Sequence, residues 1–221
     1  MFIIKTNLET KSHIGGRAVL PMGQGKPSSI TGIPLTFFFT IQLPSSHKLS
    51  GYTLSFFCAT DEFDENFTIP EMLSTDLKNA RIPQGFLRDY QKFFKAFLFK
   101  TELAYTVEDD EEKIKIQYLE FSDHEYGKVF GWAGLPPRWI LEDESPSSYE
   151  GKSLEFLLQV RCDQSFEIFE TAPPQKEMDI FGGTKDRKKK DYFFFNQNEV
   201  FLFGQPSECF DNNVYIITQC E

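Results

Sequence analysis

The 221-residue sequence has no apolar run of the roughly 18 residues that a membrane-spanning helix needs. Its opening residues, Met1 to Ile4, are apolar, but Lys5 follows at once. The chain therefore does not open with the charged start, apolar stretch and small-residue cleavage site of a secretory signal. We expect a cytoplasmic protein that does not bind membranes.

Cysteine and histidine are both scarce. The four cysteines lie far apart, without a C-x-x-C pair, at positions 58, 162, 209 and 220. This pattern favours free thiols in a reducing compartment over disulfides. The three histidines, at positions 13, 47 and 124, are too scattered for the spacings of a zinc site. We expect neither a metal nor another cofactor.

Motifs of common catalytic sites are also missing. There is no G-x-S-x-G nucleophile turn. Gly151-Lys152-Ser153 ends like a phosphate-binding loop, but it lacks the leading glycine and runs into a predicted strand. Pro27 removes a backbone N–H from the glycine-rich turn at 23–25. The acidic clusters at 61–65 and 142–144 lack the glycine and spacing of a calcium loop. No residue can be assigned a catalytic step.

Positive charge is in the minority, with 23 basic against 33 acidic residues and a net charge of −10. An acidic surface repels nucleic acids and attracts basic proteins, although many ordinary cytosolic proteins are also acidic. The one basic run, Lys185 to Lys190, has two interpretations. It is either a mobile hairpin loop or a patch that binds an anion or a partner.

Phenylalanine is what the chain has in abundance, with 25 copies gathered in short runs. Such runs are typical of buried strands, and they occur in the same order twice. A G-x-A-x-L-P motif, an L-x-F strand and a further aromatic strand occur at 16–21, 35–41 and 54–57, and again at 131–136, 154–160 and 192–195. We predict one domain, 1–221, with diverged half-repeats at about 13–108 and 113–221.

The predicted fold class is α+β and β-rich, with mainly antiparallel strands packed into one globular unit. Flanking prolines make 35–43 a strand, which we expect to form a hairpin with 52–59. A short helical or irregular lead from Phe86 should give way to a strand near 95–107. We expect that strand to pair with 113–121, where apolar and polar residues alternate.

Five residues are candidates for ligand or partner binding. Trp132, Arg138 and Trp139 cluster around the second motif, and Arg17 occupies the place of Trp132 in the first. Two tryptophans and an arginine are typical of a recognition surface, although they could equally pack beneath a loop. Gln159 is polar within an apolar strand, so it must find a hydrogen-bond partner if it is buried.

The same segments resemble the YwqG-like bacterial domain of unknown function. The similarity covers Gly15-Gly16 leading to Leu20-Pro21, Pro34 to Phe37, Leu54 to Phe57, Leu154 to Val160, Tyr192 to Phe195 and Gln219-Cys220. The resemblance implies an internally duplicated α+β unit in bacterial cytoplasm without a settled activity. It is also compatible with an immunity-type role, because related members look like neighbours of toxin–immunity loci. Thr40 departs from the family, which has glutamine at that place in the first strand.

These observations favour a non-enzymatic interaction protein, a monomer or weak homodimer, whose acidic surface binds a basic protein. The alternative is a small-ligand-binding domain or an enzyme of unrecognised type, with a pocket between the half-repeats near Trp132, Trp139 and Gln159. A third hypothesis is a scaffold that dimerises through an exposed sheet edge.

Overall fold

Aromatic runs bounded by turn residues form the strands of this protein. In the computed structural model, which describes residues 1–62, 70–73, 78–108, 111–134, 136–179, 181–208, 210 and 212–220, β4 (Thr36–Gln42) and β5 (Tyr52–Cys58) make the predicted antiparallel hairpin. The chain is 41% strand and 5% helix, so the prediction of a β-rich antiparallel fold is confirmed. The sole α-helix of the described residues, α1 (Phe86–Tyr90), is the predicted helical lead.

The remaining elements are short. They are β1 (Phe2–Thr6), β2 (Ser12–Ile14), β3 (Val19–Pro21), β6 (Arg81–Ile82), β7 (Phe94–Lys100), η2 (Thr101–Leu103), β8 (Ala104–Thr106), β9 (Gln117–Ser122), β10 (Val129–Ala133), β11 (Ser148–Tyr149), β12 (Lys152–Ser153), β13 (Glu155–Val160), β14 (Phe166–Glu167), β15 (Lys176–Met178), β16 (Thr184–Asp186), β17 (Asp191–Tyr192), η3 (Phe195–Gln197), β18 (Glu199–Gly204) and β19 (Val214–Gln219).

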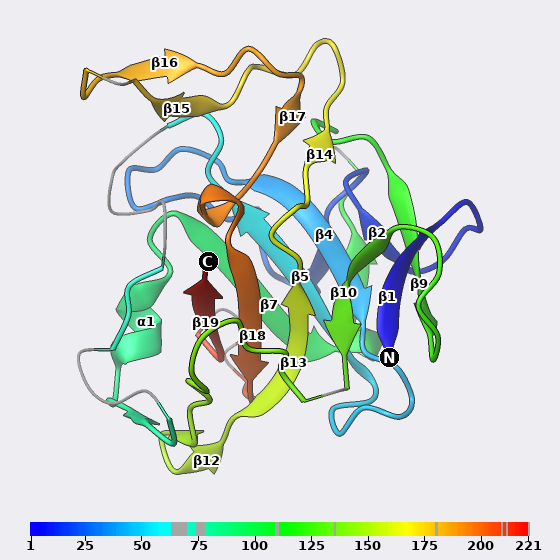
Figure 1. Ribbon diagram of the computed structural model, residues 1–221, viewed down its shortest axis with the longest axis vertical. Helices are drawn as coiled ribbons and strands as arrows, with labels where there is room; N and C mark the ends of the chain where they lie inside the picture. Colours follow the sequence, from blue (N-terminus) through cyan, green and yellow to red (C-terminus); the bar gives the residue numbers. More distant parts are fainter. Residues whose placement is uncertain are drawn as a thin grey trace.

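Ten of these strands make one antiparallel sheet that curls until it is nearly closed (Figure 1). The order is β19-β18-β13-β10-β1-β9-β2-β4-β5-β7. Outward from the central β1–β9 pair, it runs β10, β13, β18, β19 on one side and β2, β4, β5, β7 on the other. Strand β9 therefore lies between β1 and β2. The predicted pairing of 113–121 with 95–107 is wrong.

The two sides of the sheet share an irregularity. The ladder between β4 and β5 skips a residue between Phe37 and Phe39, and the ladder between β13 and β18 skips one between Phe156 and Leu158. In both places the skipped residue belongs to the first strand of the pair. An extra residue of this kind bends a strand and increases its twist, which favours a sheet that curls.

A tyrosine hydroxyl occupies the seam where the sheet almost closes. The hydroxyl of Tyr90, from α1, donates to the carbonyl of Ile216 at 2.6 Å and accepts from its N–H at 3.2 Å. Asn213 also donates across the seam, from Nδ2 to the carbonyl of Leu98 at 2.9 Å. The Tyr90 hydroxyl thus satisfies two backbone groups that a further strand would otherwise pair with.

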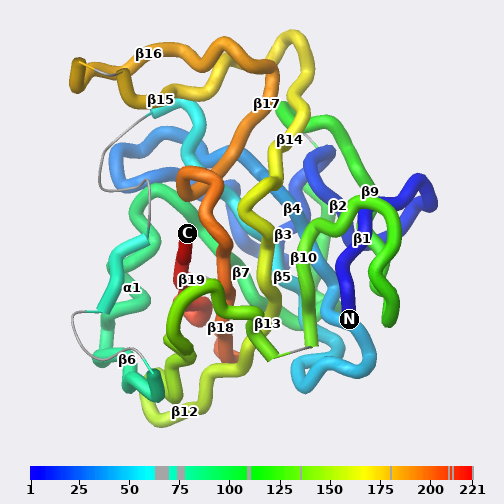
Figure 2. The backbone as a smooth tube through the Cα atoms, in the orientation of Figure 1, coloured from blue at the N-terminus to red at the C-terminus, as the bar shows by residue number. Residues whose placement is uncertain are grey.

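The connection between β13 and β18 closes one end of the curled sheet with aromatic rings. Figure 2 shows it, in yellow to orange, passing over that end before it descends into β18. Phe194 and Phe195 lie in the core, with ring centres 5.4 Å apart. Of the strand predicted at 192–195, only Tyr192 lies in a strand, β17, which pairs with β14 outside the main sheet, so the predicted equivalence with 54–57 is wrong. Residues 195–197 have positive φ angles and turn left-handed, and β18 occupies the corresponding place in the sheet.

A two-stranded ribbon of β3 and β8 lies over the outer face of β4, β5 and β7. Leu20 and Ala18 pack there in a second, smaller core with Phe37, Phe57 and Phe97. On β4, Phe39 and Ile41 face the main core, whereas Thr40 and Gln42 face outward. The strand's period of two therefore places polar groups on the outer face, beside the ribbon.

His47 joins the β4–β5 turn to β13 through two hydrogen bonds. Its Nδ1 accepts the N–H of Leu49 at 2.9 Å, so its Nε2 carries the proton and donates to the carbonyl of Phe156 at 2.9 Å. Burial lowers the pKa of His47 below its usual range. A second proton, on Nδ1, would point an N–H of the ring at the N–H of Leu49 and break that hydrogen bond.

We expect the free energy of unfolding to fall as the pH drops below about 6.5, the pKa of an unperturbed histidine. In that range the unfolded chain binds a proton that the folded chain does not. His47→Asn should be less stable at pH 7.5 but lose less stability between pH 7.5 and 5.5. Urea unfolding at both pH values measures this. Parallel losses in the two proteins would contradict the prediction.

Candidate functional site

Four of the five predicted site residues meet on the outer face of β10, β13 and β18. The amide of Gln159 holds the main chain of Arg138 through two hydrogen bonds. Oε1 accepts the N–H at 2.9 Å, and Nε2 donates to the carbonyl at 3.2 Å. Gln159 is only 1% exposed, so its amide needs hydrogen-bond partners within the protein. It finds them in the main chain of this segment, which it binds as a neighbouring strand would. The expectation that Gln159 finds a hydrogen-bond partner is confirmed.

A buried carboxylate completes this contact. Nε2 of Gln159 also donates to Oε1 of Glu199 at 2.6 Å, and Oε2 of Glu199 accepts the N–H of Cys162 at 2.8 Å. Glu199 is 5% exposed. A carboxylate is tolerated at this depth because both of its oxygens are hydrogen-bonded.

The two tryptophans and Arg138 pack around the segment that Gln159 holds. The guanidinium of Arg138 lies 4.6 Å from the ring centre of Trp132 and 5.1 Å from that of Phe2. Trp139 stacks on Phe201 with ring centres 4.3 Å apart. These side chains therefore bind a segment of their own chain, residues 136–142, to the sheet.

Sequence reasoning missed two further glutamines with the same role. Oε1 of Gln219 accepts the N–H groups of Ile140 and Leu141, and its Nε2 donates to the carbonyl of Glu142. Gln175 holds the main chain of Phe193 through both its N–H and its carbonyl. The signal that led to Gln159, a buried polar residue in an apolar strand, applies equally to Gln219 at the end of β19.

Arg17, the fifth candidate, lies apart from these residues at a cavity of about 510 Å³. This cavity, which we call the Thr40 cavity, opens between the outer face of β2, β4 and β5 and the β3–β8 ribbon. Its lining includes His13, Thr40, Thr53, Thr101, Tyr105 and Tyr118. Tyr118 belongs to β9, so both predicted half-repeats contribute to the cavity. Nε of Arg17 lies 3.4 Å from a carboxylate oxygen of Glu112.

Hydroxyl groups line the Thr40 cavity and bond to one another. Thr40 bonds to Ser55 at 3.1 Å, and Thr53 bonds to Thr101 at 2.9 Å. Nδ1 of His13 lies 2.8 Å from the carbonyl of Gly15, so it carries the proton and Nε2 is an acceptor. Burial lowers the pKa of His13, which keeps the ring neutral at pH 7. The residues that line the cavity therefore include tyrosines, hydroxyl-bearing side chains and one imidazole with an acceptor nitrogen.

Charged groups of both signs surround this lining. Glu9 and Glu112 contribute carboxylates, and Lys11 and Arg17 contribute cations. A polar ligand with a charged group could therefore find an opposite charge at the cavity.

A second hollow, of about 650 Å³, has more basic than acidic residues in its lining. Its lining includes the lysines at positions 5, 115, 128, 189 and 190, together with Glu167 and Asp191. Burial and the neighbouring Lys128 lower the pKa of Lys5. Lys115 forms an ion pair with Glu167, which offsets part of the positive charge.

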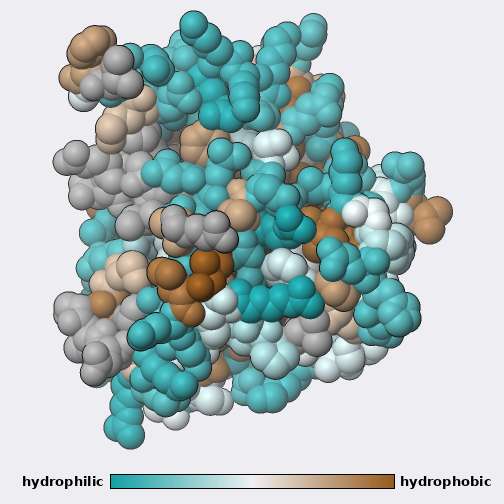
Figure 3. All heavy atoms as spheres, in the orientation of Figure 1, coloured by the Kyte–Doolittle hydropathy of each residue, from teal (hydrophilic) through white to brown (hydrophobic). Residues whose placement is uncertain are grey.

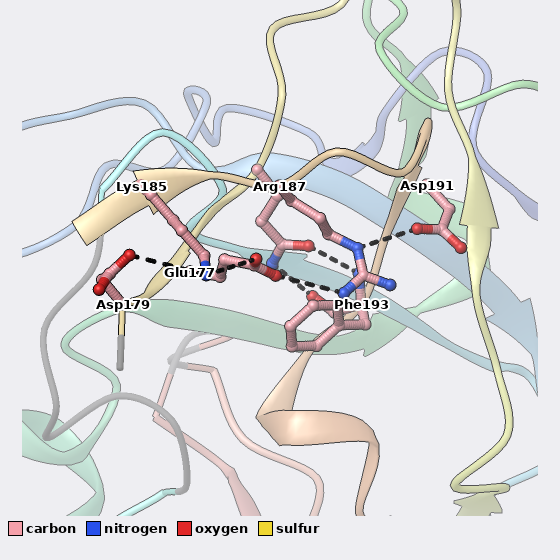
Figure 4. A network of polar contacts seen from close by, with 7 residues as sticks. Glu177, Asp179, Lys185, Arg187, Asp191 and Phe193 are labelled. Carbon is pink, nitrogen blue, oxygen red and sulfur yellow. Dashed lines mark hydrogen bonds and ion pairs between the residues drawn. The ribbon is translucent and has the colours of Figure 1, made fainter. Parts of the chain in front are cut away.

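Three of the five basic residues at 185–190 form ion pairs: Lys185 and Arg187 with acidic residues on and beside the β15–β16 hairpin (Figure 4), and Lys190 with Glu170. Arg187 lies between Glu177 at 3.5 Å and Asp191 at 3.0 Å, and its guanidinium stacks over Phe193 at 4.5 Å. Lys185 lies 3.7 Å from Asp179 and close to Glu177. These contacts connect Lys185 and Arg187 to β15 and to the segment at 191–193.

The face in Figure 3 is mostly hydrophilic, with apolar residues in small separate patches. Within the described ranges, no helix is long and apolar enough to cross a membrane, and no three histidine, cysteine or acidic residues form a metal-binding group. Cys58, Cys162 and Cys220 are free thiols. Cys209, residues 63–65 of the first acidic cluster and Leu135 of the second motif lie outside the described residues.

No family model, curated protein or solved structure matches the chain.

Proposed function

We propose that this protein is a non-catalytic binding module of the bacterial cytosol whose ligand site is the Thr40 cavity. The observation that carries the proposal is the cavity itself. Its volume of about 510 Å³ is within the range of small-ligand sites, and ring faces, hydroxyls and charges of both signs converge on it. The proposal joins the two hypotheses from the sequence, because such a cavity can accept a free ligand or a side chain of a partner.

The groups around the cavity favour binding over catalysis. Enzymes gather strongly shifted pKa values at the reacting centre. In this protein the strong upward shifts belong to core groups, such as Cys58 with a pKa of about 12, where burial is the cause. The hydroxyls of Thr40, Thr53 and Thr101 bond to other hydroxyls, and that of Thr10 donates to backbone carbonyls, so none of these is paired with a base that would activate it.

A basic partner is favoured by the charge of the whole chain. The net charge of −10 attracts cationic proteins over distances of about 10 Å at 0.1 M salt. The basic run at 185–190 counteracts this field only locally, because acidic neighbours hold Lys185 and Arg187. The expected partner is therefore a basic protein, and we expect moderate salt to weaken the complex.

We also propose that the chain is a diverged duplication of the YwqG-like type. Support comes from the sheet order, which runs outward in the same way on both sides of β1 and β9, and from the matching bulges at Phe38 and Leu157. The G-x-A-x-L-P motif does not support it. Gly16 follows β2 with a φ of 67°, whereas Gly131 lies within β10.

Thr106→Trp tests the binding site, because Thr106 is exposed and lines the cavity. Ligand-observed NMR with a library of charged metabolites and short peptides should find compounds that bind the wild type. Those compounds should lose their contact with the variant. Thr184→Trp, at an exposed position of β16, is the matched control. Ligands that bind all three proteins equally, or chemical turnover of a bound compound, would contradict the proposal.

A further inference from the structure

The outer face of the sheet carries the same arrangement twice, once filled and once open. In the filled arrangement, Trp132 pairs with Phe2 on one side and with Gln159 on the other. In the open one, His13 pairs with Tyr118 on one side and with Thr40 on the other. Each arrangement is thus a ring residue flanked by an aromatic residue and by a polar residue.

The chain leaves both ring residues in the same way. Gly134 and Gly15 each follow two positions later, with φ angles of 67° and 56°. Segment 136–142 then runs over the sheet in the filled arrangement, and β3 does so in the open one. Trp139 stacks on Phe203, and Leu20 packs in one cluster with Phe57.

The aromatic residues beneath Trp139 and Leu20 hold matching register positions. Phe203 pairs with Phe156, just before the bulge of β13, and Phe57 pairs with Phe37, just before the bulge of β4. Trp139 and Leu20 therefore correspond. Arg138 and Val19, which precede them, correspond as well.

The open arrangement has smaller side chains at the corresponding places. Thr40 stands where the filled arrangement has Gln159, and Val19 stands where it has Arg138. Thr53 stands where Glu199 lies, two residues before the register partner of the polar residue. Thr40, Val19 and Thr53 all line the Thr40 cavity. The cavity is the room that these shorter side chains leave.

The filled arrangement shows what chemistry suits that room. A guanidinium, from Arg138, lies over the rings of Trp132 and Phe2. The open arrangement offers the rings of His13 and Tyr118 instead. A cation over aromatic faces is stabilised by about 0.5–2 kcal/mol according to its exposure. Because the His13 ring is neutral, it does not repel a cation.

Carboxylates are also present at the cavity. Glu9 and Glu112 line the cavity, and Glu112 already holds Arg17 at 3.4 Å. Lys11 lines it too, so the lining as a whole is not strongly negative. Selection of the ligand therefore rests on the planar guanidinium and its fit between rings and acceptors rather than on charge alone.

We propose that the Thr40 cavity binds a guanidinium group, carried either by a small molecule such as free arginine or by an arginine side chain of a basic partner. This inference rests on the function proposed above and names the ligand class of the same site. Nε2 of His13 and the nearby carboxylates accept hydrogen bonds from the guanidinium, and the ring of Tyr118 covers one of its faces.

Isothermal titration calorimetry of the full chain tests this inference. The ligands are free arginine, citrulline as the uncharged analogue, lysine as a cation without a planar head, and the peptide acetyl-Pro-Pro-Arg-Trp-Ile-Leu-amide, which copies residues 136–141. We expect a guanidinium ligand to bind roughly tenfold more tightly than its citrulline counterpart, as one cation–π contact allows. Binding by the free amino acid alone points to a small molecule, and binding by the peptide alone points to a partner protein.

A variant whose own side chain fills the cavity gives a second test. Val19→Arg places a guanidinium from the chain itself into the cavity, so it should abolish binding. Met22→Arg adds the same charge at a position that is 69% exposed and outside the lining, so it should leave binding unchanged. Tyr118→Leu should weaken binding several-fold by removing one ring face. Equal binding by the wild type and Val19→Arg would overturn the site.

The failures of the two proposals can be told apart. Suppose that neither free arginine nor the peptide binds, while other library compounds bind the wild type but not Thr106→Trp. The guanidinium inference is then wrong, and the proposed binding function stands. If no compound at all depends on Thr106, both are wrong. Equal affinity for arginine and citrulline would overturn the guanidinium inference alone.

Discussion

Gly131→Ala is expected to destabilise the protein by more than about 4 kcal/mol, the upper end of what single substitutions do. Gly131 lies in β10, and a Cβ added there would stand 1.9 Å from the carbonyl oxygen of Gln159 and 3.0 Å from its carbonyl carbon. Both atoms belong to the backbone of β13, so no side chain can move aside. The β10–β13 ladder would have to separate in the middle of the sheet.

Urea unfolding followed by tryptophan fluorescence measures this loss, and Trp132 lies beside the substituted residue. A domain has only about 5–15 kcal/mol of stability, so the variant should unfold at a much lower urea concentration or accumulate in insoluble form. Gly183→Ala is the matched control, because an added Cβ there meets nothing within 4 Å. A Gly131→Ala protein as stable as that control would show that β10 and β13 are not neighbours in this register.

Gln159→Leu is expected to cost about 3 kcal/mol, because each buried polar group left without a hydrogen bond costs about 1–3 kcal/mol. Leucine fills similar space but leaves Oε1 of Glu199 without the donor that lies at 2.6 Å. It also releases the N–H and carbonyl of Arg138, which Gln159 binds at 2.9 and 3.2 Å. Segment 136–142 would then depend on Gln219 and on the stacking of Trp139.

Two measurements separate local release from global loss. Urea unfolding gives the change in stability, and trypsin should cleave after Arg138 much faster in the variant under native conditions. Gln24→Leu is the control, because the hydrogen bond of the Gln24 side chain is a 3.4 Å contact with Gly25, and surface changes usually stay within about 0.5 kcal/mol. Unchanged cleavage at Arg138 would mean that Gln159 does not hold the segment.

The sequence predicted those parts of the fold whose causes are local. Prolines and an apolar run delimit β4, and a short turn leads to β5, so the hairpin was predictable. The neighbours of β9 were not, because they come from Phe2–Thr6 and Ser12–Ile14 in the other half of the chain. An alternating strand specifies which face is buried but not which strand lies beside it.

The candidate site, too, was predictable only where the cause is local. Gln159 could be identified because a buried amide must be satisfied, whatever its partner. Its partner Glu199 could not, because a glutamate that begins a strand looks like a surface residue until the strand is placed. The Thr40 cavity could not be predicted either. It arises because side chains on separate segments are shorter than their counterparts in the filled arrangement, and the sequence does not show which residues are counterparts.

The place of β1 bears on how the chain is made. Phe2 pairs with Ser122 and Trp132, so β1 is synthesised well before the two strands beside it, which come from the second half of the chain. At about 5–20 residues per second, the interval lasts roughly 6–26 s. During that time β2, whose neighbour β9 is also missing, leaves one edge of the nascent β2–β4–β5–β7 sheet uncovered. A chaperone that binds apolar strands, engaged before residue 122 emerges, would find its substrate at the segment Phe2–Ile4.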